Sequence, residues 1–154
     1  MLVSIYTDAS YCPEKKVGSF AFYISSEFGT NASCGVLKQV TNPMDAEMMS
    51  ITNALHTLRK SSIGREKISF IEIYSDCLGA FKKINRKYNH LIGQKIIAEI
   101  DKIRADSDIK DKRIAIHRLI HVKSHTKLND KASIGNQYCH DMAIQMLNVA
   151  RQNS

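Results

Sequence analysis

The first forty residues alternate short apolar runs with polar turns, a pattern typical of β-strands. Residues 2–10 form an apolar, β-prone run that suits a strand covered on both faces. A second run covers residues 18–24, and a third short one covers residues 34–37. Because these runs follow one another closely, they predict an antiparallel meander.

A helical pattern starts at Asn42. Asn suits a helix cap, Pro43 suits the first helical position and Asp45 suits the positive end of the helix dipole. Apolar residues then recur at steps of three and four, which predicts one face packed against the sheet. These residues are Met44, Met48, Ile51, Leu55 and Leu58.

Strand and helix patterns alternate through the rest of the chain. Strands are expected at residues 68–74 and 113–122. A helix with Leu78, Phe81 and Ile84 on its buried side follows the first of them, and another is expected at about 91–104. A last helix, at roughly 136–151, has an apolar stripe of Tyr138, Met142, Met146 and Val149. This alternation predicts parallel crossover units and an α/β fold.

Composition and charge narrow the function classes. The 154 residues suit one domain spanning 1–154, and 44% hydrophobic with 24% charged residues is typical of a globular protein. No apolar run reaches transmembrane length and no leader is evident, so we expect a cytoplasmic protein without membrane contact. The four cysteines form no C-x-x-C pair, and a net charge of +7 favours a polyanionic partner such as nucleic acid.

Four acids and one histidine are candidates for chemistry. Asp8 and Asp76 each end a predicted strand, where α/β sheets place ligands, and His125 follows the last strand. Glu47 and Asp141 lie on predicted helices beside stripe residues. Each acid also has a simpler interpretation: a turn residue for Asp8, a helix cap for Asp76, and a solvated helix acid for the other two.

Taken together, five segments resemble type I ribonuclease H, in the same order and on the same kinds of element from residue 2 to about 150. The segments are Thr7-Asp8-Ala9-Ser10, Ala46-Glu47-Met48, Tyr74-Ser75-Asp76, Val122-Lys123-Ser124-His125 and Cys139-His140-Asp141-Met142-Ala143. The resemblance implies an RNase H-like fold: a five-stranded mixed sheet flanked by helices. Its first three strands would be antiparallel and its last two parallel to the first.

The resemblance also implies a reaction. A monomeric enzyme would cut the RNA strand of an RNA/DNA hybrid internally, leaving 5′-phosphate and 3′-hydroxyl ends. Two Mg²⁺ ions would serve the attacking water and the leaving oxygen, and Mn²⁺ can substitute. Asp8 would bridge both ions, and Asp141 would help hold the ion that activates water. Glu47 and Asp76 would hold the other ion, while His125 would be the family's mobile loop histidine.

Two groups of residues are candidate contacts to the hybrid. Polar residues close to the catalytic positions suit the minor groove or phosphate. These are Ser10, Thr41 and Asn42. A basic helix end suits the phosphates of the other strand, although a solvated helix face explains it nearly as well. Its residues are Lys82, Lys83, Arg86 and Lys87.

The chain departs from the family pattern in three ways. It has no Trp, and the long basic handle of some members is missing. The interval from His125 to Asp141 is longer than in the compact bacterial enzymes. Asn136 lies five residues before Asp141, whereas the family's usual Asn lies four before the acid.

Two alternatives remain at this level. One is another nuclease of the same superfamily, an exonuclease or a resolvase. The exonucleases carry a second acid two residues after the first, where this chain has Ser10. The other is a nucleic-acid-binding module that keeps the fold without catalysis.

Overall fold

The computed structural model describes residues 1–107, 109, 111, 115–122 and 131–153, with side chains in the last range from residue 134 onward. A five-stranded sheet forms its centre, in the order β3-β2-β1-β4-β5. β1, β2 and β3 are antiparallel neighbours, whereas β4 pairs parallel with β1, and β5 parallel with β4. The predicted mixed sheet is therefore confirmed. The strands are Leu2–Cys12, Val17–Ser26, Gly29–Leu37, Phe70–Ser75 and His117–His121.

β1 is the central strand and is covered on both faces, as its composition predicts. Five consecutive middle residues, from Val3 to Thr7, are buried except for Ser4, and Asp8 is only 2% exposed. β1 extends two residues beyond the predicted end because Tyr11 and Cys12 still pair with β2. A buried central strand of this kind can carry a carboxylate into a site shielded from water.

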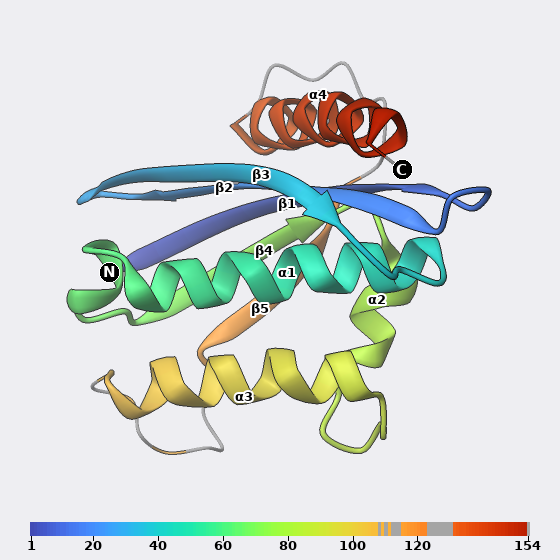
Figure 1. The fold of residues 1–154 in the computed structure, drawn as a ribbon. Coiled ribbons are helices and arrows are strands. Elements are labelled where there is room, and N and C mark those ends of the chain that lie inside the picture. The colour runs from blue at the N-terminus through green and yellow to red at the C-terminus, as the bar shows by residue number, and fades with distance from the viewer. Residues whose placement is uncertain (108, 110, 112–114, 123–130, 154) are drawn as a thin grey trace.

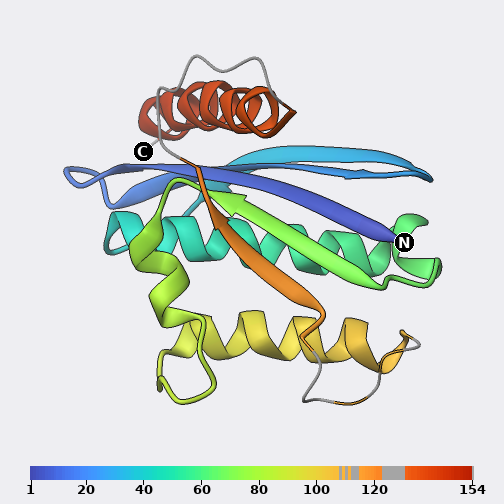
Figure 2. The same cartoon turned by 180° about the vertical axis from the view of Figure 1, so that it is seen from behind.

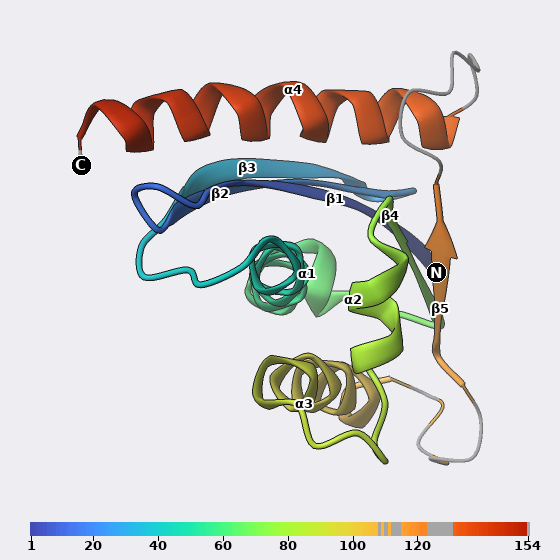
Figure 3. The same ribbon diagram turned by 90° about the vertical axis from the view of Figure 1, so that its right-hand side faces the viewer.

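Helices cover both faces of the sheet. α1 (Pro43–Lys60), α2 (Leu78–Lys83) and α3 (Leu91–Ala105) lie on one face, and α4 (Lys131–Gln152) lies alone on the other. A short 3₁₀ turn at Ile63–Arg65 follows α1. Seen from behind, β4 and β5 lie beside β1 and above α3 (Figure 2). Figures 1 and 3 show α1 enclosed between the sheet and α3, with α4 across the sheet from them.

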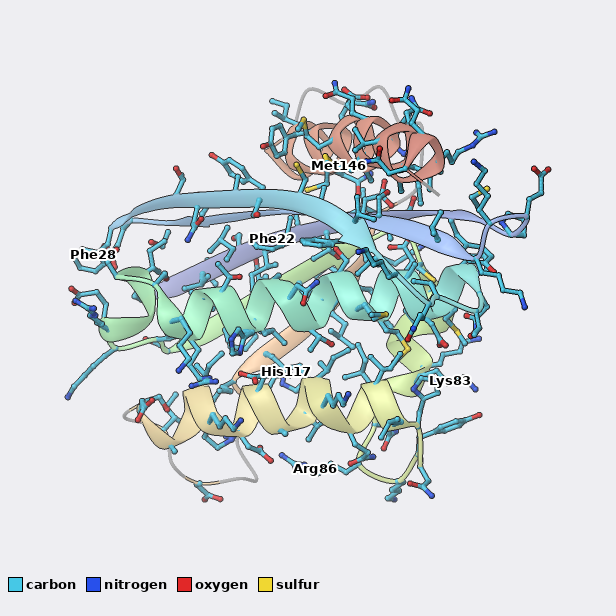
Figure 4. The ribbon with its side chains drawn as sticks, in the orientation of Figure 1. Phe22, Phe28, Lys83, Arg86, His117 and Met146 are labelled. Atoms are coloured by element: carbon cyan, nitrogen blue, oxygen red, sulfur yellow. The ribbon has the colours of Figure 1, made fainter. Side chains whose placement is uncertain are left out.

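α1 begins as its sequence predicts. The Oδ1 atom of Asn42 accepts a 2.8 Å hydrogen bond from the backbone N–H of Asp45, and Pro43 occupies the first turn. From Met48 onward the predicted stripe is fully buried, while Met44 at the start is only partly buried. Phe22 of β2 packs in the same core between the sheet and α1 (Figure 4). This apolar contact fixes α1 along the length of the sheet.

α4 differs from the prediction in both its start and its buried face. It begins at Lys131 rather than near residue 136, and Tyr138 and Val149 are 39% and 40% exposed. Besides the polar Asn136, the buried residues are small: Gly135, Cys139, Ala143 and Ala150. Hydrophobicity alone predicts that the large apolar residues of α4 face the sheet. The helix lies so close to the sheet that only small side chains fit between them. Met142 and Met146 are half-buried at the edge of the contact, and Figure 4 shows Met146 between α4 and the sheet.

Smaller differences occur elsewhere. Leu78 is exposed, because it starts the short α2 just beyond the end of β4, whereas Phe81 and Ile84 are buried as predicted. α3 buries Ile96, Ile100 and Ile103, also as predicted. Among the described residues, no helix combines the length and apolar character needed to cross a bilayer.

The close approach of α4 generates a stability prediction. A Cβ atom added at Gly135 would lie 2.5 Å from the ring of Tyr6, which is buried and stacked on Tyr74. We expect Gly135→Ala to destabilise the protein by about 1–3 kcal/mol through overpacking. This loss exceeds the gain of about 1 kcal/mol from replacing Gly in a helix. Urea unfolding would measure the difference.

Gly79→Ala is the matched control for this change. Gly79 also lies in a helix, but its added Cβ would meet only Met44 Sδ, at an ordinary 3.6 Å. This variant should be as stable as the parent or more stable. A Gly135→Ala protein more stable than the parent would contradict the close packing of α4.

Candidate active site

Three acidic side chains meet at the carboxyl end of the central strands. They are Asp8 on β1, Glu47 on α1 and Asp76 directly after β4. One carboxylate oxygen from each lies within 4.8 Å of the others. Among the described residues, no other set of three such acids, histidines or cysteines is this close.

The sheet register brings Asp8 and Asp76 together. Tyr6 of β1 pairs with Tyr74 of the parallel strand β4, and each aspartate follows its tyrosine by two residues. Parallel neighbours end at the same edge of a sheet, so the two carboxylates must lie side by side. Their tyrosine rings stack with centroids 4.8 Å apart, which reinforces this pairing.

A buried serine positions Glu47 relative to Asp8. Ser50 lies on α1 one turn after Glu47, and its Oγ atom is 3.0 Å from the backbone oxygens of both Asp8 and Ala21. The hydroxyl therefore shares its proton between β1 and β2. Because residues three apart lie on the same side of a helix, this anchor also directs Glu47 toward the end of β1.

The electrostatics of the three carboxylates favour the binding of a cation. Burial raises the pKa of Glu47 well above its usual value, and the nearby Asp8 and Asp76 carboxylates raise it further. Its Oε2 atom is buried and has no hydrogen-bond partner within the described part of the chain. Burial and the Asp8 charge also raise the pKa of Asp76, which His140 and His121 partly offset. A divalent cation would fit this oxygen-rich, negatively charged cluster.

Asp8 has distinct partners on its two oxygens. Oδ1 accepts a 2.9 Å hydrogen bond from the backbone N–H of Ala9, and Oδ2 lies 3.0 Å from Nδ1 of His140 on α4. These contacts hold the carboxylate between the sheet and α4. His140 is thus the residue of the last helix that contacts the acidic group, and it was not among the predicted site residues.

Asp141 does not join the three acids. Its side chain is exposed, and Oδ1 accepts a 2.9 Å hydrogen bond from Nε2 of Gln137. The helix explains the difference: successive residues rotate by about 100°, so Asp141 lies about 200° around from the buried Cys139. One sequence signal was available, since Asn136 lies four residues before His140, which is the spacing that the family's Asn has to its acid.

The structure removes one alternative for Asp76. The N-cap residue of α2 is Cys77, and its side chain makes no capping hydrogen bond. Instead, Oγ of Ser75 accepts a 3.1 Å hydrogen bond from the backbone N–H of Cys77. The interpretation of Asp76 as a helix cap is therefore wrong.

The other predicted site residues have varied surroundings. His125 lies outside the described residues, so its role stays a prediction. Asn42 uses its side-chain oxygen as the α1 cap, and the Thr41 hydroxyl lies 3.4 Å from Asp45 Oδ2. Ser10 is half-buried and pairs with Ser19 across the β1–β2 ladder.

The predicted basic residues differ in their existing partners. Lys83 lies 2.7 Å from the Tyr88 hydroxyl and 4.2 Å from that ring's centroid, and Arg86 makes a two-pronged ion pair with Asp101 on α3. Figure 4 shows Lys83 and Arg86 around the connection from α2 to α3. Lys82 and Lys87 are exposed. Lys83 and Arg86 would have to give up these contacts before binding a phosphate backbone. Lys82 and Lys87 are therefore the better candidates of the four.

A match to a known protein family covers all the elements that carry these acids. The family model described as RNase H matches residues 2–148, which is nearly the whole chain. A search of curated proteins gives no match. The matched region contains all three clustered acids.

The raised pKa of Glu47 generates a prediction about pH and stability. In the unfolded chain Glu47 loses its proton near its usual pKa of 4.5. In the folded protein the raised pKa keeps Glu47 protonated to a higher pH. In the presence of a chelator, stability should therefore fall as the pH rises from 4.5 through the raised pKa. Glu47→Gln cannot ionise and should escape this loss, gaining about 1–3 kcal/mol at neutral pH. Thermal melting across this pH range would measure it.

Glu14→Gln provides the matched control, because Glu14 is exposed in the turn between β1 and β2. It should melt like the parent at every pH. Replacing the chelator with Mg²⁺ should raise the melting temperature of the parent more than that of Glu47→Gln. Equal pH profiles for the parent and Glu47→Gln would contradict the electrostatic account.

Proposed function

Because the chain belongs to the RNase H family, we propose that it hydrolyses the RNA strand of RNA/DNA hybrids internally, leaving 5′-phosphate and 3′-hydroxyl ends. The observation that carries this proposal is the convergence of Asp8, Glu47 and Asp76 within 4.8 Å. A binding module without catalysis would gain nothing from three carboxylates that repel one another. Their electrostatic strain suits a site built for cations.

The cofactors in this proposal are two Mg²⁺ ions, for which Mn²⁺ can substitute. Bound there, they would supply an activated water and stabilise charge on the leaving oxygen. Asp8 would hold both ions; its closeness to Glu47 and its 3.0 Å contact with His140 support this role. Glu47 and Asp76 would hold one of them, and the buried Oε2 atom of Glu47, which has no hydrogen-bond partner among the described residues, would be one of the ligand atoms.

The chain's own residues would orient the hybrid around this site. Ser10, Thr41 and Asn42 are proposed contacts to phosphates or to the 2′-hydroxyls of the minor groove. The 2′-hydroxyls are the groups that distinguish RNA from DNA. Asn42 caps α1 with its oxygen, and its amide nitrogen donates one hydrogen bond to the Thr41 hydroxyl at 3.3 Å, so the second amide N–H would serve this task. His125, on the segment before α4, would carry a proton at the site or assist product release.

The function test compares substrates and one matched variant. The parent with Mg²⁺ should cut a labelled RNA strand internally in a hybrid and leave duplex DNA intact. Asp76→Asn should lose hydrolysis, because the amide lacks the charge that holds a cation, while hybrid binding survives on the basic residues. Its melting temperature in chelator should not fall, since Asp76 caps no helix. Gel assays of cleavage and binding, with melting, would measure all three.

Two results would contradict the function. Removal of single deoxynucleotides from a 3′ end would move the chain to the exonuclease type. Normal cleavage by a folded Asp76→Asn protein would remove this carboxylate from the mechanism.

The basic residues generate a second prediction. Lys82 and Lys87 are exposed, so replacing both with Ala should weaken hybrid binding and reduce its salt dependence, by about one unit of slope per lysine. The turnover of bound hybrid should change little, because neither residue contacts the acids. Binding titrations at several salt concentrations would measure the slope.

Lys60→Ala is the control for charge alone. Lys60 is also exposed, but it ends α1 about 20 Å along the helix axis from Glu47. It should leave both affinity and salt slope near parental values. An equal effect from Lys60→Ala would show that net charge, rather than this basic surface, binds the hybrid.

A further inference from the structure

The contact between His140 and Asp8 indicates a metal ligand set that differs from four carboxylates. α4 presents Cys139 to the sheet, where its Sγ donates to the backbone oxygen of Tyr6 at 3.3 Å. One step of about 100° around the helix brings His140 to the rim of the acidic group. The next step takes Asp141 to the exposed side, where it pairs with Gln137.

The distance between the two side chains suits a shared ion. His140 Nδ1 and Asp8 Oδ2 are 3.0 Å apart. Two ligand atoms that bind one ion at roughly 2.0–2.2 Å, at right angles, are themselves about 3.0 Å apart. The pair can therefore accept a cation with little rearrangement of either side chain.

Two further buried atoms belong to the same region. Glu47 Oε2 is buried without a hydrogen-bond partner among the described residues, and the same holds for Oδ1 of Asn136. Asn136 lies one turn before His140, on the same side of α4. Unpartnered buried oxygens are rare in folded proteins, and an ion or an ordered water is a common explanation.

We propose that His140, rather than Asp141, is the fourth metal-ligating side chain of this site, and that its nitrogen makes the ion shared with Asp8 favour Mn²⁺ over Mg²⁺. The inference rests on the proposed function, because it assigns a ligand to the cation site of that reaction. Imidazole nitrogen binds transition metals such as Mn²⁺ better than Mg²⁺, which prefers oxygen ligands and gives up its waters reluctantly. An all-carboxylate site would show this preference more weakly.

The experiment measures metal binding directly. Mn²⁺ is titrated into the protein, and the loss of its free-ion electron paramagnetic resonance signal reports binding, first alone and then against excess Mg²⁺. We expect His140→Ala to weaken one Mn²⁺ site by about tenfold or more, the effect of losing a metal-site group. His140→Asp should restore binding but let Mg²⁺ compete more strongly. Asp141→Asn should bind Mn²⁺ as the parent does.

A spectroscopic signature separates ligation from simple positioning of Asp8. With ¹⁵N-histidine in the protein, electron spin echo modulation of bound Mn²⁺ should show a directly bonded nitrogen, and His140→Asp should remove it. His125→Ala, measured in parallel, should keep it. Melting of each variant in chelator confirms that it is folded.

The outcomes are decisive and distinct from those of the function test. Unchanged Mn²⁺ affinity in a folded His140→Ala protein, or loss of the site in Asp141→Asn alone, would overturn the assignment. Loss of the nitrogen signal in His125→Ala but not in His140→Asp would overturn it as well. If the metal results are as expected but the parent cuts no hybrid, the ligand assignment stands and the proposed function fails.

Discussion

Repulsion among three carboxylates that the fold holds close together is the constraint on which the site depends. Two unit charges 4.8 Å apart repel by about 3.5 kcal/mol at an effective dielectric constant of 20. Within the described part of the chain, no lysine or arginine pairs with these acids, and the ion pair of the cluster is that of His140 with Asp8. Glu47 is left with a raised pKa and with a buried oxygen that has no hydrogen-bond partner among the described residues. The apolar core of β1, α1 and α3 must supply the stability that keeps the acids in place.

The scaffold around the acids is correspondingly rigid. Asp8 lies on β1, which is buried on both faces. Asp76 follows the parallel neighbour β4 directly, at the same register as Asp8. Ser50 ties the backbone of α1 to β1 and β2 near the site. Each carboxylate thus belongs to a different element, but the elements are joined by hydrogen bonds close to the site. Preorganised ligands of this kind bind a cation without a further loss of conformational entropy.

The small residues of α4 connect packing to chemistry. Gly135 leaves room for the Tyr6 ring, and Cys139 and Ala143 let the helix lie close to the sheet. A larger side chain at these positions would lift the helix and move His140 away from Asp8. The face of α4 with the small residues is therefore the one that packs on the sheet. This packing sets the distance between the side chains of α4 and the acids.

The basic residues of α2 and of the loop after it differ in their roles. Arg86 stabilises the connection to α3 through Asp101, and Lys83 packs on Tyr88. Lys82 and Lys87 remain exposed. A run of basic residues in sequence is therefore not a uniform binding surface, because some of its members already hold the protein together.

The sequence by itself determined the antiparallel start of the sheet, its later crossover units, and the cap and stripe of α1. It also determined that Asp8 lies on the first strand, Glu47 on the first helix and Asp76 directly after β4, although β1 continues past Asp8 to Cys12 instead of ending there. Those features follow from local periodicity, capping chemistry and the rule that parallel strands end at one edge. The buried face of α4 and the choice of His140 over Asp141 as the partner of Asp8 were decided only by the tertiary structure. A rotation of one residue on a helix separates the two side chains by about 100°, and hydrophobicity points to the wrong face when close packing requires small residues.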